Sequence, residues 1–426
     1  MANQFKDSMG RPIVVVTGMG VVTSLGQGKE DNWKKLTSGV SGIHRITRFP
    51  IDGLKTTISG TVDFLFDRPV AAPELSERLA ALAAEEAVAQ SGIGAKADFP
   101  GPLFCAVPPV EIEWPQRNAI AAEADPAAAF TPELALEISG RSRHPEWHEM
   151  FLFGTVADRI ADRFGTKGLP ISVSTACASG GTAIQLGAEA IRRGDCEAAP
   201  ALGTDGSGHA EPLIRFSLLS ALSTQNENPT QASKPFSKNR DGFVIAEGAG
   251  ALVLESLEHA TKRGAKILGV VAGFGEVSDS FHRTRSSPDG KPIIACINNA
   301  LKDAGIGAGD IDYINAHGTS TPENDKMETL GVTEVFGKDT KIPISSNKSM
   351  IGHTLSAAGA VEAVFSLLTL AHQRIPPTIN YTVPDPLIPL DVVPNTARDA
   401  KVTRVLSNSF GFGGQNVSIV LSGEPA

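Results

Sequence analysis

The stretch Ile171-Ser-Val-Ser-Thr-Ala-Cys177-Ala-Ser-Gly-Gly-Thr-Ala183 begins with β-prone residues and continues into small residues typical of a tightly packed helix. Cys177 is therefore expected at a helix start, where backbone N–H groups lack intrahelical partners and the helix dipole is positive. Both features favour a thiolate, so the pattern predicts a lowered thiol pKa and a nucleophilic role. The alternative is a buried, inert cysteine, the commoner fate of a lone Cys.

Two histidine motifs downstream favour the nucleophile. His317 lies in Asn-Ala-His-Gly-Thr-Ser-Thr, and His353 lies in Asn-Lys-Ser-Met-Ile-Gly-His-Thr-Leu-Ser. Each adjoins glycine and small hydroxyl residues, so its ring can line a cavity. A third glycine-rich turn, Asn408-Ser-Phe-Gly-Phe-Gly-Gly-Gln-Asn416, allows close approach of the backbone to a ligand.

An internal repeat indicates an α/β fold made of two related halves. A helix at 74–90, a Gly-Ile-Gly-Ala turn and a strand at 103–107 are followed later by a helix at 293–303, a second Gly-Ile-Gly-Ala turn and a strand from 311. The strand and helix around Cys177 likewise resemble Ile342-Pro-Ile-Ser-Ser and the helix expected at 356–371. Repeated strand and helix units imply sheets covered by helices, with the helix starts of both halves facing one site. We place the halves at 11–265 and 266–424, folded as one unit.

Composition excludes several classes of function. A net charge of −9 over 426 residues argues against nucleic acid or an anionic membrane as the main partner. The four cysteines contain no CxxC pair, so we expect no disulfide framework, no metal site and a reducing, cytoplasmic location. The apolar runs are short and broken by glycine, so no membrane span is expected.

Residues 108–150 are rich in proline, alanine and acidic residues. We expect a poorly structured insertion there. A surface excursion or an arm that contacts a partner is the alternative.

With these motifs in order, the chain resembles the β-ketoacyl-acyl carrier protein synthases of the elongating type, from about Val14 to Leu421. The resemblance rests on Thr-Ala-Cys-Ala-Ser-Gly, His-Gly-Thr-Ser-Thr and Asn-Lys-Ser-Met-Ile-Gly-His, supported by residues 240–250 and 407–414. It implies a thiolase-like five-layer αβαβα fold with two duplicated halves, a homodimer, and no cofactor. It further implies that acyl carrier protein delivers both substrates on its phosphopantetheine arm.

The family's activity gives each motif a role. Cys177 would attack the acyl thioester, and malonyl-acyl carrier protein would then lose carbon dioxide and lengthen the chain by two carbons. Neutral His317 and His353 would each donate an N–H to the enolate oxygen that decarboxylation creates. The backbone N–H groups of Cys177 and Phe410 would form the oxyanion hole, and the Phe410 ring would gate the acyl chain.

Three more positions follow from the resemblance. Lys348 is expected to be buried near the histidines with Glu362 as its partner, where a solvated surface lysine is the usual alternative. Thr319 and Thr321 would hydrogen-bond the pantetheine arm, or merely cap the turn after His317.

Other functions remain open at this stage. A non-catalytic subunit resembling a chain-length factor would have lost the nucleophile, which is present here. A degradative thiolase would need a second catalytic cysteine near the C-terminus, and the last cysteine is Cys296. A polyketide or nodulation-type ketosynthase shares the same motifs. An unusual segment from Cys105 and a helix at 75–86 with Arg78 as almost its only cation suggest a specialised carrier and a specialised, very long acyl chain.

Overall fold

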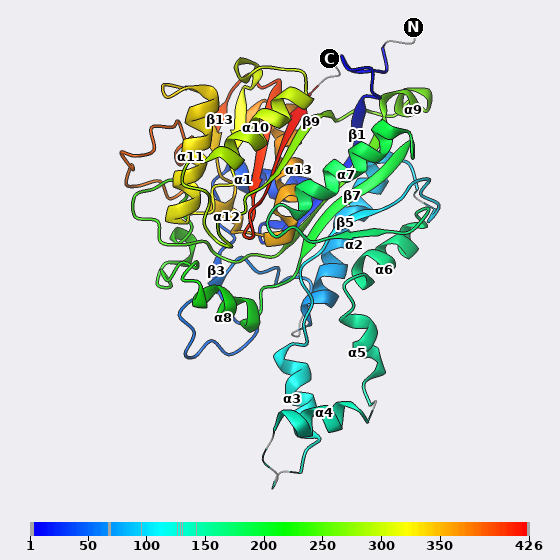
Figure 1. Ribbon diagram of the computed structural model, residues 1–426, viewed down its shortest axis with the longest axis vertical. Helices are drawn as coiled ribbons and strands as arrows, with labels where there is room; N and C mark the ends of the chain where they lie inside the picture. The colour runs from blue at the N-terminus through cyan, green and yellow to red at the C-terminus, as the bar shows by residue number, and fades with distance from the viewer. Residues whose placement is uncertain are drawn as a thin grey trace.

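The computed structural model describes the chain except for residues 1–3, 67–69, 95, 126, 128, 130, 142 and 424–426. Residue 424, where the second predicted half ends, and Ala95 of the first Gly-Ile-Gly-Ala turn lie outside the described residues. The described chain is a mixed α/β protein built on one large hydrogen-bonded sheet (Figure 1).

The first half contributes one set of strands to this sheet. These are β1 (Val14–Thr23), β5 (Phe104–Ala106), β6 (Ile171–Val173), β7 (Ala198–Asp205) and β8 (Gly248–Ser256). They lie in the order β1-β8-β7-β5-β6. The strands β5, β6 and β7 run parallel, and β8 is antiparallel to both of its neighbours.

The second half repeats this topology. Its strands are β9 (Gly269–Ser278), β10 (Tyr313–Asn315), β11 (Ile344–Ser345), β14 (Arg404–Phe410) and β15 (Gln415–Ser422). They lie in the order β9-β15-β14-β10-β11. In both halves, the first strand along the chain is followed across the sheet by the last, the penultimate, the second and the third, and the strand directions are the same. The duplication expected from the sequence repeat is confirmed. A short pairing of β1 with β9, at Val15–Val270 and Val16–Gly269, joins the two sets.

Helices complete the layers. The helix α2 (Ala72–Ser91) covers the outer face of the first set, and α10 (Lys291–Asp303) covers that of the second, with α11 (Pro322–Phe336) against α10. Between the two sets lie α7 (Ser179–Arg193) and α13 (Ala358–His372), which contact each other and strands of both halves. This is the five-layer thiolase-like arrangement. The division at 265 stays a prediction.

Shorter elements connect these layers. They are β2 (Gly26–Gln27), β3 (His44–Arg45), β4 (Ile58–Ser59), β12 (Arg374–Ile375), β13 (Arg398–Asp399), α1 (Lys29–Thr37), α6 (Thr155–Phe164), α8 (Ala210–Leu218), α9 (Leu257–Lys262) and α12 (Lys348–Ile351), with the 3₁₀ turns Pro229–Gln231, Ala308–Asp310 and Leu355–Ala357.

One stretch in the described residues, Leu355–His372, is long and apolar enough to cross a membrane. It corresponds to α13 with the preceding 3₁₀ turn, and 83% of it is buried inside the protein. Because both half-sheets pack against it, this stretch is a core helix and not a membrane span.

The segment 108–150 corrects an expectation. It forms α3 (Trp114–Ala122), α4 (Pro132–Ser139) and α5 (Pro145–Met150), which project from the body as an arm (Figure 1). Pro115, Pro132 and Pro145 each lie in the first turn of one of these helices, where a missing N–H costs nothing. The expectation of a poorly structured insertion is therefore wrong, and the alternative, a surface excursion, is confirmed. Pro126 lies outside the described residues.

Candidate active site

Cys177 lies in a strained turn between β6 and α7. Ala176 has a φ of 49°, a left-handed conformation that costs free energy for a residue with a side chain. The Ser179 hydroxyl holds this turn, because it accepts the N–H of Thr175 at 2.7 Å and donates to the carbonyl of Ala176 at 2.6 Å. The sulfur is thereby fixed one residue before Ala178, the N-cap of α7, as the sequence predicts.

The thiol pKa differs from the expectation. Burial raises the pKa of Cys177 to about 11, which outweighs the backbone N–H of Phe412 and the charge of Lys348, both of which lower it. The helix start alone does not ionise the sulfur, because the loss of hydration on burial destabilises a thiolate by more than the backbone N–H groups stabilise it. The resting group is a thiol that must lose its proton during reaction.

His353 contacts the sulfur directly. Its Nε2 lies 3.0 Å from the Cys177 Sγ, and its Nδ1 accepts the N–H of Leu355 at 3.2 Å. A nitrogen that accepts carries no proton, so in the neutral ring the proton is on Nε2 and faces the sulfur. Burial and then the charge of Lys348 lower the pKa of His353 well below its usual value, so the ring is neutral.

His317 stands opposite His353, with ring centroids 5.3 Å apart. Glu328 on α11 fixes the backbone here, because its carboxylate oxygens accept the N–H groups of His317 and Gly318 at 2.8 and 2.7 Å. Burial, the charge of Lys348 and the neighbouring His353 lower the pKa of His317 well below its usual value. Sequence reading missed Glu328, although its place eleven residues after His317, on the helix that follows the turn, is visible in the chain.

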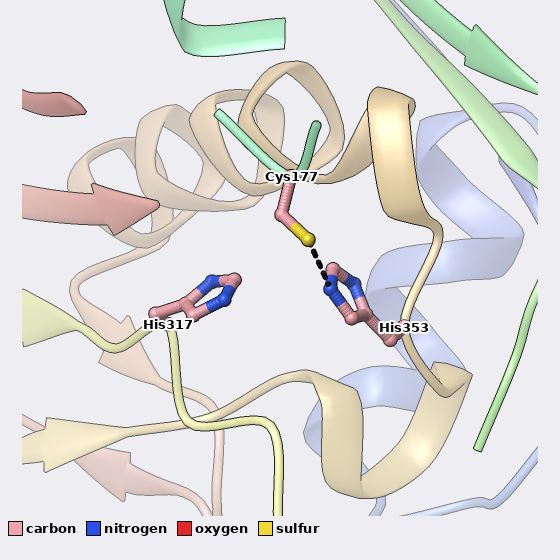
Figure 2. Close-up of side chains that lie close together, drawn as sticks. All are labelled: Cys177, His317 and His353. Atoms are coloured by element: carbon pink, nitrogen blue, oxygen red, sulfur yellow. Dashed lines mark hydrogen bonds between the residues drawn. The ribbon is translucent and has the colours of Figure 1, made fainter. Parts of the chain in front are cut away.

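The structure brings the three principal residues together. The Cys177 sulfur and one nitrogen of each histidine all lie within 4.8 Å of one another, and Figure 2 shows both rings pointing toward the sulfur from separate segments. They line a cavity of about 880 Å³ that also includes Thr319, Thr321 and Phe412. One sulfur and two imidazoles at this spacing could also hold a metal ion. That no metal acts here stays a prediction.

Two helix starts meet beneath this site, one from each half. A Cβ added to Gly359 of α13 would lie 2.5 Å from the backbone nitrogen of Gly181 in α7, and one added to Gly180 would lie 2.6 Å from that of Ala360. Real Cβ atoms do not approach backbone this closely, so glycine is required where the helices cross. The same crossing sets the Cys177 turn beside the His353 segment.

Lys348 and Glu362 form a buried ion pair next to the histidines. Each residue is only 1% exposed, and the Lys348 Nζ donates to a carboxylate oxygen of Glu362. Burial raises the pKa of Glu362 to about 7, against the lowering effect of Lys348. The surface alternative for Lys348 does not hold, and its charge acts on both imidazoles.

We expect the Lys348→Met substitution to change the pH profile of condensation. Burial, the larger cause of the low histidine pKa values, remains in this variant, but loss of the positive charge raises the pKa of both histidines, so the neutral rings are lost at a higher pH than in the wild type. Rates measured from pH 5.5 to 8 should therefore begin to fall at a higher pH on the acid side than those of the wild type. The double variant Lys348→Met/Glu362→Gln avoids an uncompensated buried carboxylate, which alone costs about 3–5 kcal/mol. An unchanged profile in both variants would contradict this electrostatic role.

The structure places Thr319 and Thr321 on the cavity wall but gives them further contacts. Their hydroxyl oxygens lie 3.0 Å apart, and Thr321 accepts the N–H of Asn324 at 3.2 Å as the N-cap of α11. Capping by Thr321 is therefore observed. Binding of the pantetheine arm by either residue stays a prediction.

The two phenylalanines of the glycine-rich turn have different positions. Phe410 ends β14, is 7% exposed, and packs on His317 with ring centroids 6.0 Å apart. Its backbone carbonyl faces the His317 ring, whereas the N–H of Phe412 faces the Cys177 sulfur. The oxyanion-hole role of Phe410 stays a prediction, and the N–H that lies beside the sulfur is that of Phe412. The Phe412 ring is partly exposed, and its centroid lies 6.3 and 6.5 Å from those of Phe216 and Phe243. Gating by the Phe410 ring also stays a prediction.

Sequence reading also missed Asp205 at the end of β7, which lines the same cavity. Its carboxylate accepts the N–H groups of Ser207 and Ser356 at 2.9 and 3.0 Å, so it ties β7 to the segment that leads into α13. Burial raises its pKa to about 6. No motif marks this residue in the sequence.

Comparison with known proteins gives consistent matches over nearly the whole chain. The family descriptions "Beta-ketoacyl synthase, N-terminal domain" and "Beta-ketoacyl synthase, C-terminal domain" match residues 11–260 and 268–382. A 3-oxoacyl-[acyl-carrier-protein] synthase 2 of Coxiella burnetii is 38% identical over 418 residues, which are 96% of this chain and 98% of the relative. A putative polyketide beta-ketoacyl synthase 1 of Streptomyces cyaneus is 37% identical over 420 residues, with the same coverage.

Solved structures show the same likeness. A chain from the complex of a type II polyketide synthase acyl carrier protein with its ketosynthase, bound to a hexaketide, has a TM-score of 0.85 and 33% identity. The match covers 97% of this chain and 100% of that chain. A beta-ketoacyl synthase from Burkholderia phymatum has a TM-score of 0.81 and 30% identity, with the same coverage.

Proposed function

Because this chain belongs to the β-ketoacyl synthase family, we propose that it catalyses the decarboxylative condensation of an acyl thioester with malonyl-acyl carrier protein, as a 3-oxoacyl-[acyl-carrier-protein] synthase. The observation that carries the proposal is the contact of 3.0 Å between the Cys177 sulfur and His353 Nε2, with the neutral His317 ring facing both. A nucleophile and two N–H donors around one point are what this reaction requires.

The first half-reaction loads the acyl group. The Cys177 sulfur attacks the thioester carbonyl, and the resulting oxyanion is bound by the backbone N–H groups of Cys177 and Phe412. When this tetrahedral intermediate collapses, the pantetheine sulfur leaves and takes up the proton that the Cys177 thiol has lost. The covalent product is an acyl-enzyme.

The second half-reaction uses the histidines. Malonyl thioester loses carbon dioxide, and the electron pair of the broken bond forms an enolate whose oxygen accepts N–H donors from His317 and His353. Neutral imidazoles suit this role, because each supplies a donor without a proton that the carbanion could remove easily. The carbanion attacks the acyl-Cys177 carbonyl, the sulfur leaves, and the 3-oxoacyl product is two carbons longer.

The proposed reaction predicts a defined product. Acyl-acyl carrier protein and malonyl-acyl carrier protein, incubated with the enzyme, should yield one equivalent of carbon dioxide per 3-oxoacyl chain, as measured by mass spectrometry. Primers of graded length test the specialised, very long acyl chain suggested by the sequence, and a strict preference for medium-chain primers would exclude it. A polyketide ketosynthase, favoured by the relative from Streptomyces cyaneus, would instead add several malonyl units before release. No product with any primer would refute both.

Acyl carrier protein is the partner, and we infer that it docks at the cavity mouth. Exposed Arg283, Arg285 and Lys326 lie there, whereas the expected docking helix carries Arg78. Carrier proteins are acidic, so a basic rim would steer them and orient the arm toward Cys177.

Reversing two of these charges should weaken docking. We expect Arg283→Glu/Arg285→Glu to raise the KM for acyl-acyl carrier protein about tenfold, with a smaller effect at high salt. The rate with a free acyl-pantetheine thioester should not change. Arg78→Glu is the matched comparison, and a larger effect of that variant would return the docking surface to α2.

The family also supports a proposal about assembly and location. We propose a cytoplasmic homodimer in which the arm contacts the partner subunit, since it exposes Leu136 at 75% and Trp114 at 47%. Large exposed apolar side chains on a projecting segment favour burial against another surface. Light scattering of the wild type and of Leu136→Glu would test this.

A further inference from the structure

A small side pocket that contains ionisable residues adjoins the large cavity at the base of the arm. Glu113, His209 and Glu211 line the side pocket, and Pro109, Ser207, Pro212 and Arg215 line both it and the cavity that contains Cys177. Its free volume is about 10 Å³, room for one water-sized group. Buried ionisable groups beside the cavity that holds Cys177 need a chemical reason.

Two buried polar atoms in this recess lack a hydrogen-bond partner among the described residues. Glu113 is 3% exposed, and its Oε1 accepts the N–H of Ala72 at 2.7 Å, but its Oε2 has no partner. The Nε2 of His209 has no hydrogen-bond partner, while the backbone carbonyl of Gly206 faces the His209 ring and His209 Nδ1 lies 3.9 Å from Glu113 Oε2, too far for a hydrogen bond. Leaving such groups unpaired is costly, so a third group is expected between them.

The neighbours define what that group can be. Burial, with Glu211 and Glu111 nearby, raises the pKa of Glu113 to about 8, and burial followed by the Arg48 charge lowers the pKa of His209 to about 4. Both groups are therefore neutral at pH 7. Arg215 pairs with Glu111 at 3.2 Å, and Glu211 accepts the N–H of Trp114. A neutral carboxyl group beside a neutral imidazole matches a ligand that both donates and accepts.

We propose that Glu113 and His209 bind a hydroxyl group carried on the acyl chain, which makes them specificity-determining residues for a hydroxylated acyl substrate. This rests on the proposed function, since the chain is the one held on Cys177. The hydroxyl hydrogen-bonds Glu113 Oε2 and His209 Nε2 together. The free volume fits a hydroxyl group, and the neutral pair gives an ammonium group no charge to pair with.

The test compares matched substrates. Formation of acyl-Cys177 is measured with saturated acyl-acyl carrier proteins and with isomers that carry one hydroxyl at successive positions along the same chain. For wild type, we expect kcat/KM to be about tenfold higher or more for at least one hydroxylated isomer than for its saturated parent. Glu113→Met and His209→Phe should lose this preference and keep the rate with the saturated chain. Glu113→Gln, which keeps a polar atom at the positions of both carboxylate oxygens, should retain part of the preference for the hydroxylated isomer.

The controls separate the two proposals. Glu123→Met makes the same substitution on the arm but outside the side pocket, and should keep the preference. If wild type transfers saturated chains but prefers no hydroxylated isomer, the hydroxyl pocket is refuted while the proposed function stands. Transfer of neither kind of chain would refute the proposed function. A preference that survives in both Glu113→Met and His209→Phe would place the hydroxyl elsewhere and overturn the assignment.

Discussion

Replacement of Cys177 by alanine is expected to abolish acyl-enzyme formation and to lower condensation by about 10³-fold or more. Among the described residues, the remaining cysteines line neither this cavity nor its side pocket, so the acyl group has no second thiol acceptor there. Intact-protein mass spectrometry after incubation with acyl-acyl carrier protein gives the direct readout. The wild type should gain the mass of one acyl group and the variant none.

The same variant separates the two half-reactions. Cys177→Ala retains His317 and His353, so release of carbon dioxide from malonyl-acyl carrier protein should continue at a measurable rate. Cys105→Ala, which changes a fully buried thiol outside the cavity, is the matched control and should load normally. Labelling with cerulenin should follow the same pattern. Persistent condensation in Cys177→Ala would refute the catalytic role and favour a subunit that only shapes the cavity of a partner.

The fold was predictable because its two halves repeat local patterns. The helices expected at 74–90 and 293–303 correspond to α2 and α10, and in each half the strand that follows lies between two parallel neighbours. The arm was not predictable from its prolines. A proline disrupts a helix interior but starts a helix well, and its place relative to the helix start decides which applies.

The site was predictable where a motif fixes a residue and unpredictable where packing decides. Cys177, His317 and His353 each stand in a distinctive motif, and they lie together. Phe410 and Phe412 lie in one motif, so the sequence does not distinguish their positions. In the structure, Phe410 pairs with Asn416 as the last residue of β14, and Phe412 lies beyond the end of that strand. The thiol pKa depends on burial, which the residues near Cys177 in sequence do not reveal.

Replacement of either histidine by alanine is expected to lower condensation by about 10²–10³-fold, because each removes one N–H donor to the enolate oxygen. His317→Ala should still form acyl-Cys177 near the wild-type rate, since the sulfur contacts His353. His353→Ala should slow both half-reactions, because it removes the Nε2 contact of 3.0 Å. The measurements are single-turnover acylation and release of carbon dioxide, followed separately.

Asparagine variants test whether donation is the essential property. An amide supplies N–H donors and does not titrate, so His317→Asn should recover part of the loss in decarboxylation. His372→Ala is the matched control, because His372 ends α13 and stacks on Trp33 with centroids 5.2 Å apart, away from the cavity. If alanine and asparagine at 317 were equally inactive, donation would not be the role of this ring. If His317→Ala kept full decarboxylation, the enolate would have to be stabilised by His353 and the backbone alone, and the two-donor mechanism would fail.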